Sequence, residues 1–487
     1  MNETTNKITQ QTSSYSGDPK KGISQYYFLG IGGIGMSALA RFFNEKGGQV
    51  AGYDRTQSKV TDDLIREGIS ITFDEALDTI PADFLDPQKT LVVITPAVPS
   101  EHEQLIFFQK NGFQIMKRSE VLGAITRKSK AICIAGTHGK TTTSTMTAHL
   151  MHQSHVECSA FLGGISNNYG TNLILSKESN YVVVEADEYD RSFHHLSPFM
   201  AVITSMDPDH LDIYGTEDAF IESFVHFTSL IKSGGVLIVN KKATIHPTLQ
   251  KGVRLYTYGL DVNADFHATN IRTEQGKILF DFVTPTETIA NIQLGVPVMI
   301  NIENGVAAMA LAWLNGVTDK ELRTAMSTFS GIYRRFDIVY RSENTLYIDD
   351  YAHHPSELEA SISSIRQLFP ERNITGIFQP HLYTRTRDFA PDFAKALSAL
   401  DEVILLDIYP ARELPIAGVT SEIIVKDITI PNKSLANKEN LLTLLDDKTL
   451  DVLVTFGAGD IDKMVPLIKK FLKEKHKNLS ANHEPSA

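Results

Sequence analysis

AICIAGTHGKTTTST, residues 131–145, is the stretch of sequence that decides the fold of this chain. Residues 131–135 are an apolar run typical of a buried strand, a glycine turn follows at 136–139, and a helix is predicted from Lys140 to about Met151. A strand, a tight turn and a helix N-terminus together present free backbone N–H groups to an anion. The stretch therefore predicts an α/β domain with a phosphate-binding loop at the end of a strand.

The side chains of this loop suit a nucleotide phosphate and its metal ion. Lys140 is placed to meet the outer phosphates, and the hydroxyl of Thr141 is placed to hold Mg²⁺. The loop is shorter than the common phosphate-loop pattern, because Ile134 stands where that pattern has its first glycine. The alternative is a glycine-capped helix start with an exposed lysine. The residues predicted to bind ATP here are Gly136, Thr137, His138, Gly139, Lys140, Thr141 and Thr142.

Length and composition restrict the class of protein. A chain of 487 residues is too long for one core and suggests about three domains. The net charge of −12 argues against a nucleic-acid-binding surface. The two cysteines, Cys133 and Cys158, provide no disulfide framework. Because no apolar run approaches the ~20 residues of a membrane span and residues 1–20 lack the apolar centre of a signal peptide, we expect a cytoplasmic protein without a membrane partner.

The first structured segment predicts a second phosphate-binding turn. GIGGIG at residues 30–35 stands between a predicted strand and a predicted helix, and Asp54 follows about 20 residues later, where an acidic residue would meet a ribose hydroxyl. This Rossmann-like pattern suits NAD, but equally any nucleotide sugar, which also carries a diphosphate next to a ribose. The alternative is a turn that needs glycine only for packing. Lys117 and Arg118 either face the same ligand or are solvated.

Two predicted strands of the central domain end in carboxylates, and the second is also followed by a histidine. Glu185 follows one apolar run and His210 lies in a D-x-x-H turn after the next, and parallel strands bring such ends to one edge with the phosphate loop. Both residues are therefore candidates to complete a magnesium site with Thr141, although a lone histidine is more often a satisfied core residue. The polar, glycine-rich loop 163–172 is of the kind that binds a sugar or closes over a site. Alternation and threonine content predict a small antiparallel sheet over residues 253–300.

The last part of the chain predicts another doubly wound sheet. Its strands alternate with helices, and each strand ends in a polar loop that is hard to explain by packing alone. These loops hold Asp350, His353, His354 and Arg385. The predicted organisation is a disordered tail at 1–22, a Rossmann-like domain at 23–128, a central phosphate-loop domain at 129–330, a C-terminal Rossmann-like α/β domain at 331–475 and a tail at 476–487.

Three such domains suit a reaction that uses ATP to join two substrates. No cysteine or serine nucleophile stands beside a histidine in a recognisable arrangement. Phosphoryl transfer to a carboxylate, followed by attack of an amine, needs mainly positioning and charge neutralisation, which Lys140 and Mg²⁺ would supply. Arg385 would hold the carboxylate of an incoming amino acid, and domain closure would exclude water.

At this point the motifs resemble one family, the Mur ligases of peptidoglycan synthesis, and within it the alanine-adding branch. The resemblance covers nearly all of residues 24–472. It rests on GIGGIGMSALA, AGTHGKTTT, EADEYDRSF, DPDHLDIY, NIENGVAA, RRFD, DDYAHHP, QPHLYTRTRDF and DIYPARE. The short phosphate loop is the family's own version. The resemblance implies an ATP- and Mg²⁺-dependent ligase that joins L-alanine to the lactyl carboxylate of UDP-N-acetylmuramate through an acyl phosphate, acting as a monomer or homodimer.

The resemblance also implies roles for individual residues. It displaces the dehydrogenase interpretation of the glycine turn, since the UDP sugar takes that place. The residues expected to bind the UDP sugar are Gly32, Gly33, Ile34, Gly35, Asp54 and Asn172. Further ATP contacts are expected from Asn304, Arg335 and Asp350. The amino-acid end is expected to include His353, His354 and Arg385. The metal ligands are expected to be Thr141, Glu185 and His210, and the catalytic residues Lys140, His210, Glu185 and Arg385.

Two departures from the family's patterns matter. Many such ligases have HRYTRT where this chain has Leu382 in place of the first arginine, so binding of the alanine carboxylate must depend on Arg385 or on a replacement such as Arg387. Several later-acting relatives carry a carbamylated lysine 14 or 15 residues beyond the His210 position. Phe224 and Val225 stand there in this chain, which agrees with the alanine-adding branch.

Three alternatives remain at this level. A recycling ligase that attaches a preformed peptide to the same sugar nucleotide shares the fold and the ATP chemistry and differs in the acceptor pocket. An NAD-dependent oxidoreductase would use the glycine turn and would not need ATP. A non-catalytic nucleotide-binding module is disfavoured because the predicted phosphate and metal ligands are all present.

Overall fold

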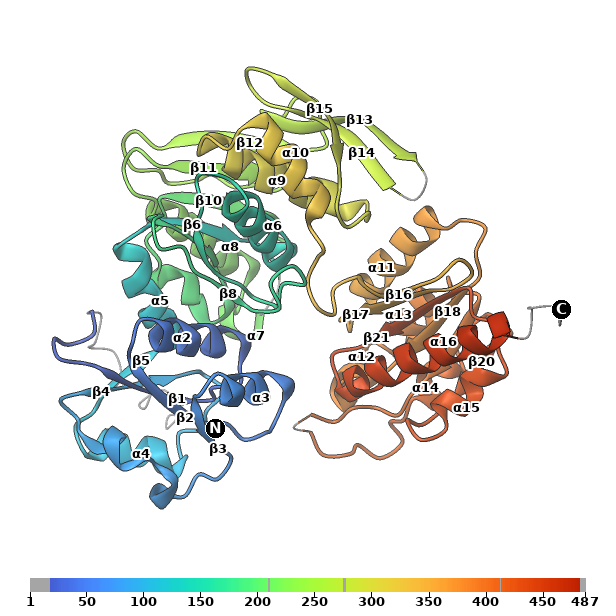
Figure 1. Cartoon of the computed structure of the whole chain (residues 1–487), viewed down its shortest axis with the longest axis horizontal. Helices are drawn as coiled ribbons and strands as arrows, with labels where there is room; N and C mark the ends of the chain where they lie inside the picture. Colours follow the sequence, from blue (N-terminus) through green and yellow to red (C-terminus); the bar gives the residue numbers. More distant parts are fainter. Residues whose placement is uncertain (1–17, 209–210, 275–276, 412, 482–487) are drawn as a thin grey trace. The chain divides into compact units, whose positions relative to one another are not determined.

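The computed structural model describes residues 18–208, 211–274, 277–411 and 413–481 of the chain. Most of the predicted N-terminal tail and the end of the C-terminal tail therefore lie outside the described residues. The chain forms two compact units, which are coloured along the sequence in Figure 1. The first unit takes residues up to 272 with 279–295 and 301–330, and the second takes 273–278, 296–300 and the chain from 331 onward.

The first domain is built on a five-stranded parallel sheet in the order β3-β2-β1-β4-β5. Its strands are β1 (Gln25–Leu29), β2 (Gln49–Tyr53), β3 (Ser70–Thr72), β4 (Thr90–Ile94) and β5 (Gln114–Lys117). Its helices are α2 (Ile34–Glu45), α3 (Lys59–Arg66), α4 (Glu103–Lys110) and α5 (Arg118–Arg127), with 3-10 turns η1 (Leu77–Thr79) and η2 (Ala82–Leu85). The strand order reverses between β1 and β4, which is where such sheets bind ligands. The glycine turn follows β1 at this point.

The central domain is built on a ten-stranded sheet in the order β15-β14-β13-β12-β11-β10-β6-β9-β7-β8. Its strands are β6 (Lys130–Ala135), β7 (Ser159–Phe161), β8 (Leu173–Ile174), β9 (Tyr181–Glu185), β10 (Met200–Ile203), β11 (Val236–Asn240), β12 (Arg254–Gly259), β13 (Phe266–Glu274), β14 (Lys277–Val283) and β15 (Thr288–Gln293). Its helices are α6 (Lys140–His152), α7 (Leu211–Tyr214), α8 (Glu217–Ser229), α9 (Ile300–Leu314) and α10 (Asp319–Thr328), with the 3-10 helix η3 (Tyr189–His195). Strand β6 pairs in parallel with β10 and β9, so the phosphate loop leaves the middle of the sheet.

The prediction of a separate small sheet over residues 253–300 was wrong in part. Strands β14 and β15 pair antiparallel, as expected. Strand β12, however, pairs in parallel with both β11 and β13, so these strands extend the central sheet instead of forming one of their own (Figure 1). Alternation identifies strands and the faces they bury, but it does not identify their partners.

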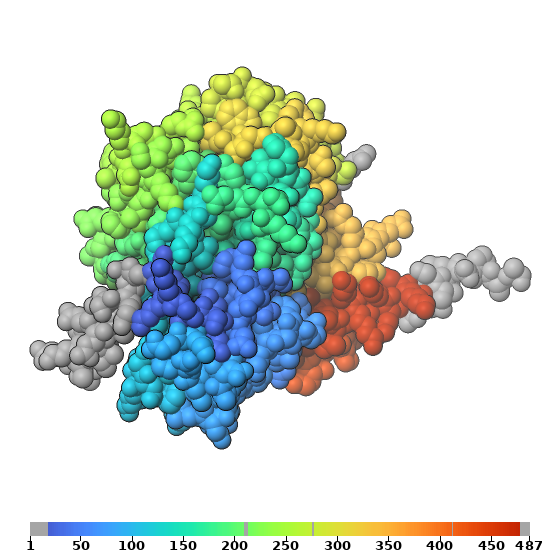
Figure 2. All heavy atoms as spheres, turned by 60° about the vertical axis from the view of Figure 1, so that its left-hand side comes forward, coloured from blue at the N-terminus to red at the C-terminus, as the bar shows by residue number. Residues whose placement is uncertain are grey.

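The first and central domains share one hydrophobic core. A single cluster of buried side chains includes Phe28 and Leu39 of the first domain and Ala131 and Phe224 of the central one. At the boundary the rings of Phe42 and Phe161 lie 5.3 Å apart. In the space-filling view of Figure 2 the blue and cyan-to-green segments accordingly form one continuous surface. These two domains therefore make up one compact unit.

The second unit contains a six-stranded sheet in the order β16-β17-β21-β18-β19-β20, in which β16 is antiparallel to β17 and the other pairs are parallel. Its strands are β16 (Asp337–Arg341), β17 (Leu346–Asp350), β18 (Ile374–Phe378), β19 (Glu402–Leu405), β20 (Lys433–Leu435) and β21 (Val452–Phe456). Its helices are α11 (Pro355–Leu368), α12 (Tyr383–Asp388), α13 (Ala390–Leu397), α14 (Glu422–Val425), α15 (Leu441–Asp446) and α16 (Met464–Ala481), with the 3-10 helix η4 (Asp460–Lys463).

The three sheets confirm the predicted α/β fold class. The core strands of each sheet are parallel and buried, and the polar loops predicted as functional follow their carboxyl ends. No helix within the described ranges is both long and apolar enough to cross a membrane.

Candidate active site

The phosphate loop is held against the end of the neighbouring strand β10. A Cβ atom on Gly136, whose φ is +130°, would lie 2.1 Å from Thr204 Oγ1 and 2.7 Å from the backbone nitrogen of Ser205. Gly139 caps helix α6 with a left-handed φ of +79°. Both positions therefore require glycine, one for close approach and one for conformation. This explains why the turn keeps its glycines although it is short.

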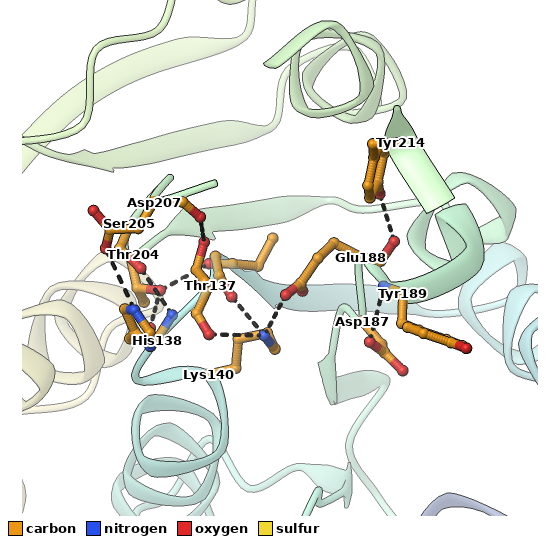
Figure 3. A network of polar contacts seen from close by, with 12 residues as sticks. Thr137, His138, Lys140, Asp187, Glu188, Tyr189, Thr204, Ser205, Asp207 and Tyr214 are labelled. Carbon is orange, nitrogen blue, oxygen red and sulfur yellow. Dashed lines mark hydrogen bonds and ion pairs between the residues drawn. The ribbon is translucent and has the colours of Figure 1, made fainter. Parts of the chain in front are cut away.

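Side chains after β10 fix the rest of the loop, as Figure 3 shows. The backbone N–H of His138 donates to Ser205 Oγ at 2.8 Å, and the hydroxyl of Thr137 donates to the Asp207 carbonyl at 2.7 Å. His138 Nε2 also lies 3.5 Å from Asp207 Oδ2. The sequence singled out the D-x-x-H turn for its possible metal ligands. The structure shows that the same segment also shapes the phosphate loop.

The side chain of Lys140 is folded over the loop that precedes it. Its ammonium donates to the Gly136 carbonyl at 2.6 Å, to the Thr137 carbonyl at 3.2 Å and to Glu188 Oε1 at 2.9 Å (Figure 3). A lysine ammonium has three N–H donors, so each is used. The ammonium therefore lies over the phosphate loop, and its contact with the outer phosphates of a nucleotide stays a prediction.

Glu188 contacts the predicted phosphate-binding lysine although the sequence did not identify it as a site residue. It lies in the turn after β9, it is 2% exposed, and burial raises its pKa above the ordinary value in spite of the neighbouring Lys140. Its backbone carbonyl accepts a hydrogen bond from the Tyr214 hydroxyl at 2.5 Å. The signal was present, because Glu188 is the second glutamate of the EADE segment, but nothing in the spacing distinguished it from Glu185.

The predicted metal ligands are only partly located. Thr141 opens α6 with 5% of its surface exposed. Glu185 ends β9 and packs on the polar loop, since a Cβ atom on Gly163 would lie 2.0 Å from Glu185 Oε2. His210 lies outside the described residues. Within the described ranges, no three histidine, cysteine or carboxylate side chains are grouped so that they could hold a metal ion, and the magnesium site stays a prediction.

Asn304 comes to the phosphate loop from helix α9. A Cβ atom on Gly139 would lie 2.6 Å from Asn304 Oδ1, and the same oxygen accepts a hydrogen bond from the Thr143 hydroxyl at 3.3 Å. Its amide nitrogen donates to Asn301 Oδ1 at 3.3 Å. This arrangement places the residue beside the loop, where it supports the glycine that caps α6; its contact with adenine stays a prediction.

In the first domain, Asp54, the residue predicted to bind a ribose hydroxyl, contacts the glycine turn. Asp54 Oδ2 accepts a hydrogen bond from the Gly32 N–H at 2.7 Å, and Oδ1 accepts one from Thr56 N–H at 3.1 Å. Gly33 is the N-cap of α2, which begins at Ile34. Asp54 therefore fixes the conformation of the glycine turn, and its hydrogen bond to a ribose hydroxyl stays a prediction.

Arg118 connects this turn to the central domain. Its side chain packs against Gly35, where a Cβ atom would lie 2.9 Å from Arg118 Nη1, and its Nη2 donates to Asp187 Oδ2 at 3.1 Å. Lys117 pairs with Asp190 in the same way at 3.2 Å. The basic pair thus lies between two acidic side chains and the glycine turn, and neither residue simply extends into solvent.

Asn172 makes structural contacts that the sequence did not predict. The side chain is fully buried. It donates to the Ile34 carbonyl at 2.6 Å and to Ser37 Oγ at 2.9 Å, and it accepts from Arg41 Nη1 at 2.5 Å. Arg41 is in turn held by Glu67 at 2.8 Å. The amide therefore joins helix α2 to the polar loop of the central domain, while its assignment to the sugar stays a prediction.

In the second unit, the two arginines of the RRFD segment differ in their surroundings. Arg334 is 7% exposed and donates to Asp349 Oδ2 at 3.1 Å. Its side chain therefore forms a buried ion pair inside the domain. Arg335 is exposed. Asp350 ends β17 and accepts hydrogen bonds from Ser361 Oγ at 2.7 Å and Ala352 N–H at 3.0 Å. Burial raises the pKa of Asp350 to about 6.

The predicted amino-acid end forms a small cluster of rings and one guanidinium. Arg385 Nη1 lies 3.4 Å from His381 Nδ1, and the rings of His381 and His353 are 6.1 Å apart. Burial lowers the pKa of His353, which favours its neutral form. His354 instead caps α11 and contacts Ser356 Oγ at 2.9 Å. The structure therefore groups Arg385 with His353 and adds His381, while His354 lies at the helix start.

A cavity of about 270 Å³ opens at the carboxyl ends of β18, β19 and β21 in the same unit. Its polar lining includes Asp407, Tyr409 and Lys438, and Lys438 pairs with Asp460 at 2.6 Å. Such a position is where sheets of this topology bind small ligands.

A glycine turn at one switch point and a lysine-bearing phosphate loop at the centre of a second sheet define a nucleotide-binding α/β protein of the phosphate-loop class. Comparison with known proteins narrows this class. The chain belongs to the Mur ligase family: family models match residues 25–130 (Mur ligase family, catalytic domain), 134–312 (Mur ligase middle domain) and 334–459 (Mur ligase, glutamate ligase domain).

Individual relatives agree with this assignment. The chain is 58% identical over 454 residues to the UDP-N-acetylmuramate–L-alanine ligase of Phocaeicola vulgatus, covering 93% of this chain and 99% of that one. It is 46% identical over 452 residues to the ligase of the same name from Flavobacterium johnsoniae, covering 93% and 98%. The crystal structure of the UDP-N-acetylmuramate–alanine ligase from Thermotoga maritima matches with a TM-score of 0.78 at 25% identity, covering 93% and 99%. The predicted resemblance is confirmed.

A murein peptide ligase from Psychrobacter arcticus has the same fold, with a TM-score of 0.63 at 20% identity over 93% of this chain and 98% of that one.

Proposed function

We propose that this protein is an ATP-dependent ligase that joins L-alanine to the lactyl carboxylate of UDP-N-acetylmuramate, releasing ADP and phosphate. The observation that carries the proposal is the 58% identity to a ligase of that name over 93% of the chain. The geometry of the phosphate loop supports it, because the loop and the Lys140 ammonium are arranged for the outer phosphates of a nucleotide. Because both nucleotides belong to biosynthetic metabolism, the proposed site of action is the cytoplasm.

The chemistry follows in two steps. An oxygen of the lactyl carboxylate attacks the γ-phosphorus of ATP, the bond to the β,γ-bridging oxygen breaks, and ADP leaves. The amine of L-alanine then attacks the acyl phosphate carbon, phosphate leaves with the bonding electron pair, and the amine loses a proton. The N–H groups of Thr137 and His138 donate to Ser205, so we assign the phosphates to the backbone N–H groups at the N-terminus of α6, where Lys140 would stabilise the charge that develops on the transferring group.

The proposed metal site uses oxygen donors that suit Mg²⁺. The hydroxyl of Thr141 and the carboxylate of Glu185 are hard ligands of the kind this ion prefers, and both residues follow strands or begin helices at the edge of the sheet that carries the phosphate loop. We assign these two residues, with His210, to Mg²⁺. When bound, the ion would neutralise charge on the phosphates.

The sugar nucleotide and the amino acid are assigned to opposite parts of the chain. We assign the UDP sugar to the turn formed by Gly32, Gly33, Ile34 and Gly35, which Asp54 orders. We assign the amino acid to Arg385 with His353 and His381. Without an arginine at Leu382, the guanidinium of Arg385 and the nearby imidazoles are the groups in this cluster that could face a carboxylate.

The test is a product assay. Purified protein is incubated with UDP-N-acetylmuramate, Mg-ATP and, in separate reactions, L-alanine, glycine, L-serine or a muropeptide-type tripeptide, and ADP and the amide product are measured. The proposal expects turnover to be strongest with L-alanine. Turnover with the tripeptide alone would assign the protein to peptide recycling, the function printed for the murein peptide ligase of similar fold. Absence of turnover with every acceptor would refute the ligase proposal.

A further inference from the structure

The pair formed by Lys140 and Glu188 is a feature of the phosphate loop that the proposed chemistry does not use. The lysine is conventional for such a loop, but its partner is a carboxylate whose side chain is 2% exposed, against 14% for the lysine. Glu188 Oε1 takes one N–H of the ammonium at 2.9 Å. Its second oxygen, Oε2, is buried and has no hydrogen-bond partner within the described part of the chain.

The orientation of this carboxylate is imposed by its surroundings. The Glu188 carbonyl accepts a hydrogen bond from the Tyr214 hydroxyl at 2.5 Å, and Tyr214 is itself 5% exposed. Oδ2 of the preceding residue, Asp187, accepts a hydrogen bond from Arg118 Nη2 at 3.1 Å. Both neighbours hold the backbone in place, so the Glu188 side chain has little freedom to leave the lysine. A buried charge in this position persists only if it is paired.

These contacts set up a competition. Each N–H of the ammonium already has an acceptor: two carbonyls of the loop and one carboxylate. A nucleotide phosphate can reach the ammonium only by replacing or sharing one of them. The two carbonyls belong to the loop that wraps around the phosphate, whereas Glu188 is the negatively charged member of the set and competes with the phosphate for the same positive charge.

We infer that Glu188 is a positioning residue that acts as the internal counter-ion of Lys140: it weakens nucleotide binding while it fixes the ammonium in one place for phosphoryl transfer. This inference rests on the proposed nucleotide site. Holding the ammonium by a fixed carboxylate raises the rate, because a preorganised charge needs no rearrangement in the transition state. The same carboxylate also lowers the affinity of the protein for bound nucleotide, so that ADP is released more easily.

The first experiment measures binding of ADP without metal, so that a role in holding Mg²⁺ does not contribute. Glu188→Gln keeps the size of the side chain and removes its charge. Isothermal titration of the full-length protein with ADP in EDTA should show about ten-fold tighter binding to Glu188→Gln than to wild type, since hydrogen bonds between charged groups are roughly twice as strong as neutral ones. In the ligase assay, the same variant should lose at least about ten-fold in kcat while its KM for ATP falls.

Asp187→Asn is the matched control. It removes the same charge one residue away, from a carboxylate that pairs with Arg118 and not with Lys140, and its affinity for ADP should stay within about two-fold of wild type. Equal tightening in both variants would mean that only the local charge matters, and would overturn the inference. Unchanged or weaker binding of ADP to Glu188→Gln would also overturn it. If wild type itself binds no ADP, the proposed nucleotide site fails first.

A second measurement covers the case in which Glu188→Gln alone is poorly folded. Lys140→Met leaves the buried carboxylate without its cation and should lower Tm by several degrees. Adding Glu188→Gln to Lys140→Met should recover most of that loss, because the double variant has no buried charge. A double variant less stable than Lys140→Met would show that the carboxylate has other partners and would overturn the counter-ion role.

Discussion

The clearest consequence of the structure concerns Asn172, which the sequence assigned to the sugar nucleotide. The fully buried amide makes three hydrogen bonds to α2, one of them to the Arg41 guanidinium. In Asn172→Ala, these groups lose their partner at a site that water cannot easily reach. Since a buried unsatisfied group costs about 1–3 kcal/mol and a lost bond to a charged group falls in the upper half of that range, we expect a loss of about 3 kcal/mol in the free energy of unfolding.

This loss can be converted into a melting temperature. Unfolding entropy is roughly 2 cal/mol/K per residue, so for a unit of about 300 residues 3 kcal/mol corresponds to a fall of about 5 °C in Tm. Differential scanning calorimetry of the purified chain measures it. The control is Asn167→Ala, which removes an exposed amide of the same loop that donates to the Ser330 carbonyl at 3.2 Å; we expect its Tm to fall by less than about 2 °C.

The same variants separate a structural from a ligand-binding role. If the Tm of Asn172→Ala lies within about 1 °C of wild type while the KM for UDP-N-acetylmuramate rises, the structural role is refuted. Asn172 would then be assigned to the sugar-nucleotide site.

Three further predictions can be tested with the same assays. Lys140→Ala should reduce kcat by at least about 100-fold, because its ammonium stabilises the transferring charge; near-normal turnover would contradict the assignment of the phosphate loop. Asp54→Ala should raise the KM for the sugar nucleotide more than that for ATP, because Asp54 Oδ2 holds the Gly32 N–H; an unchanged KM for the sugar nucleotide would reduce the glycine turn to a packing element. Asp350 has a folded-state pKa raised to about 6, so its protonated form favours folding and its contribution is complete below about pH 4 and lost as the pH rises through about 6. Asp350→Asn, which imitates the protonated form, should therefore gain stability relative to wild type between pH 4 and pH 7, and a constant difference in Tm over that range would show that Asp350 has no raised pKa.

The parts of the fold that local chemistry determines were predictable. Gly30, Gly136 and Gly139 have positive φ, and a Cβ atom on Gly32 or Gly35 would lie within 2.9 Å of a neighbouring side chain. Most of these glycines are therefore required locally, and the two glycine clusters mark strand-to-helix turns. Apolar runs such as residues 131–135 of β6 are buried in a parallel sheet, and a short continuous apolar run of this kind predicts a strand.

Contacts between distant segments were not predictable in this way. Glu188 meets Lys140 because β9 and β6 are neighbours in the sheet, and no spacing along the chain records that pairing. Strand β12 likewise shows its alternation in the sequence but not that it lies beside β11. Asn172 was expected to bind the sugar nucleotide, and the sequence did not predict that its amide also joins the loop of the central domain to helix α2.

The contact of Asn172 with α2 also determines which pieces of this chain can be exchanged between relatives. A chimera cut between residues 128 and 129 would transplant Arg41 and Phe42 without the loop and strand that receive them, which lie at Phe161 and Asn172. A workable exchange of the sugar-nucleotide domain must therefore bring residues 159–174 from the same parent. The sheet that follows Gly331 has a core cluster drawn from its own residues, but the second compact unit also takes residues 273–278 and 296–300. A cut at Gly331 should therefore leave that core intact, provided that these two short segments also come from the parent of the second unit.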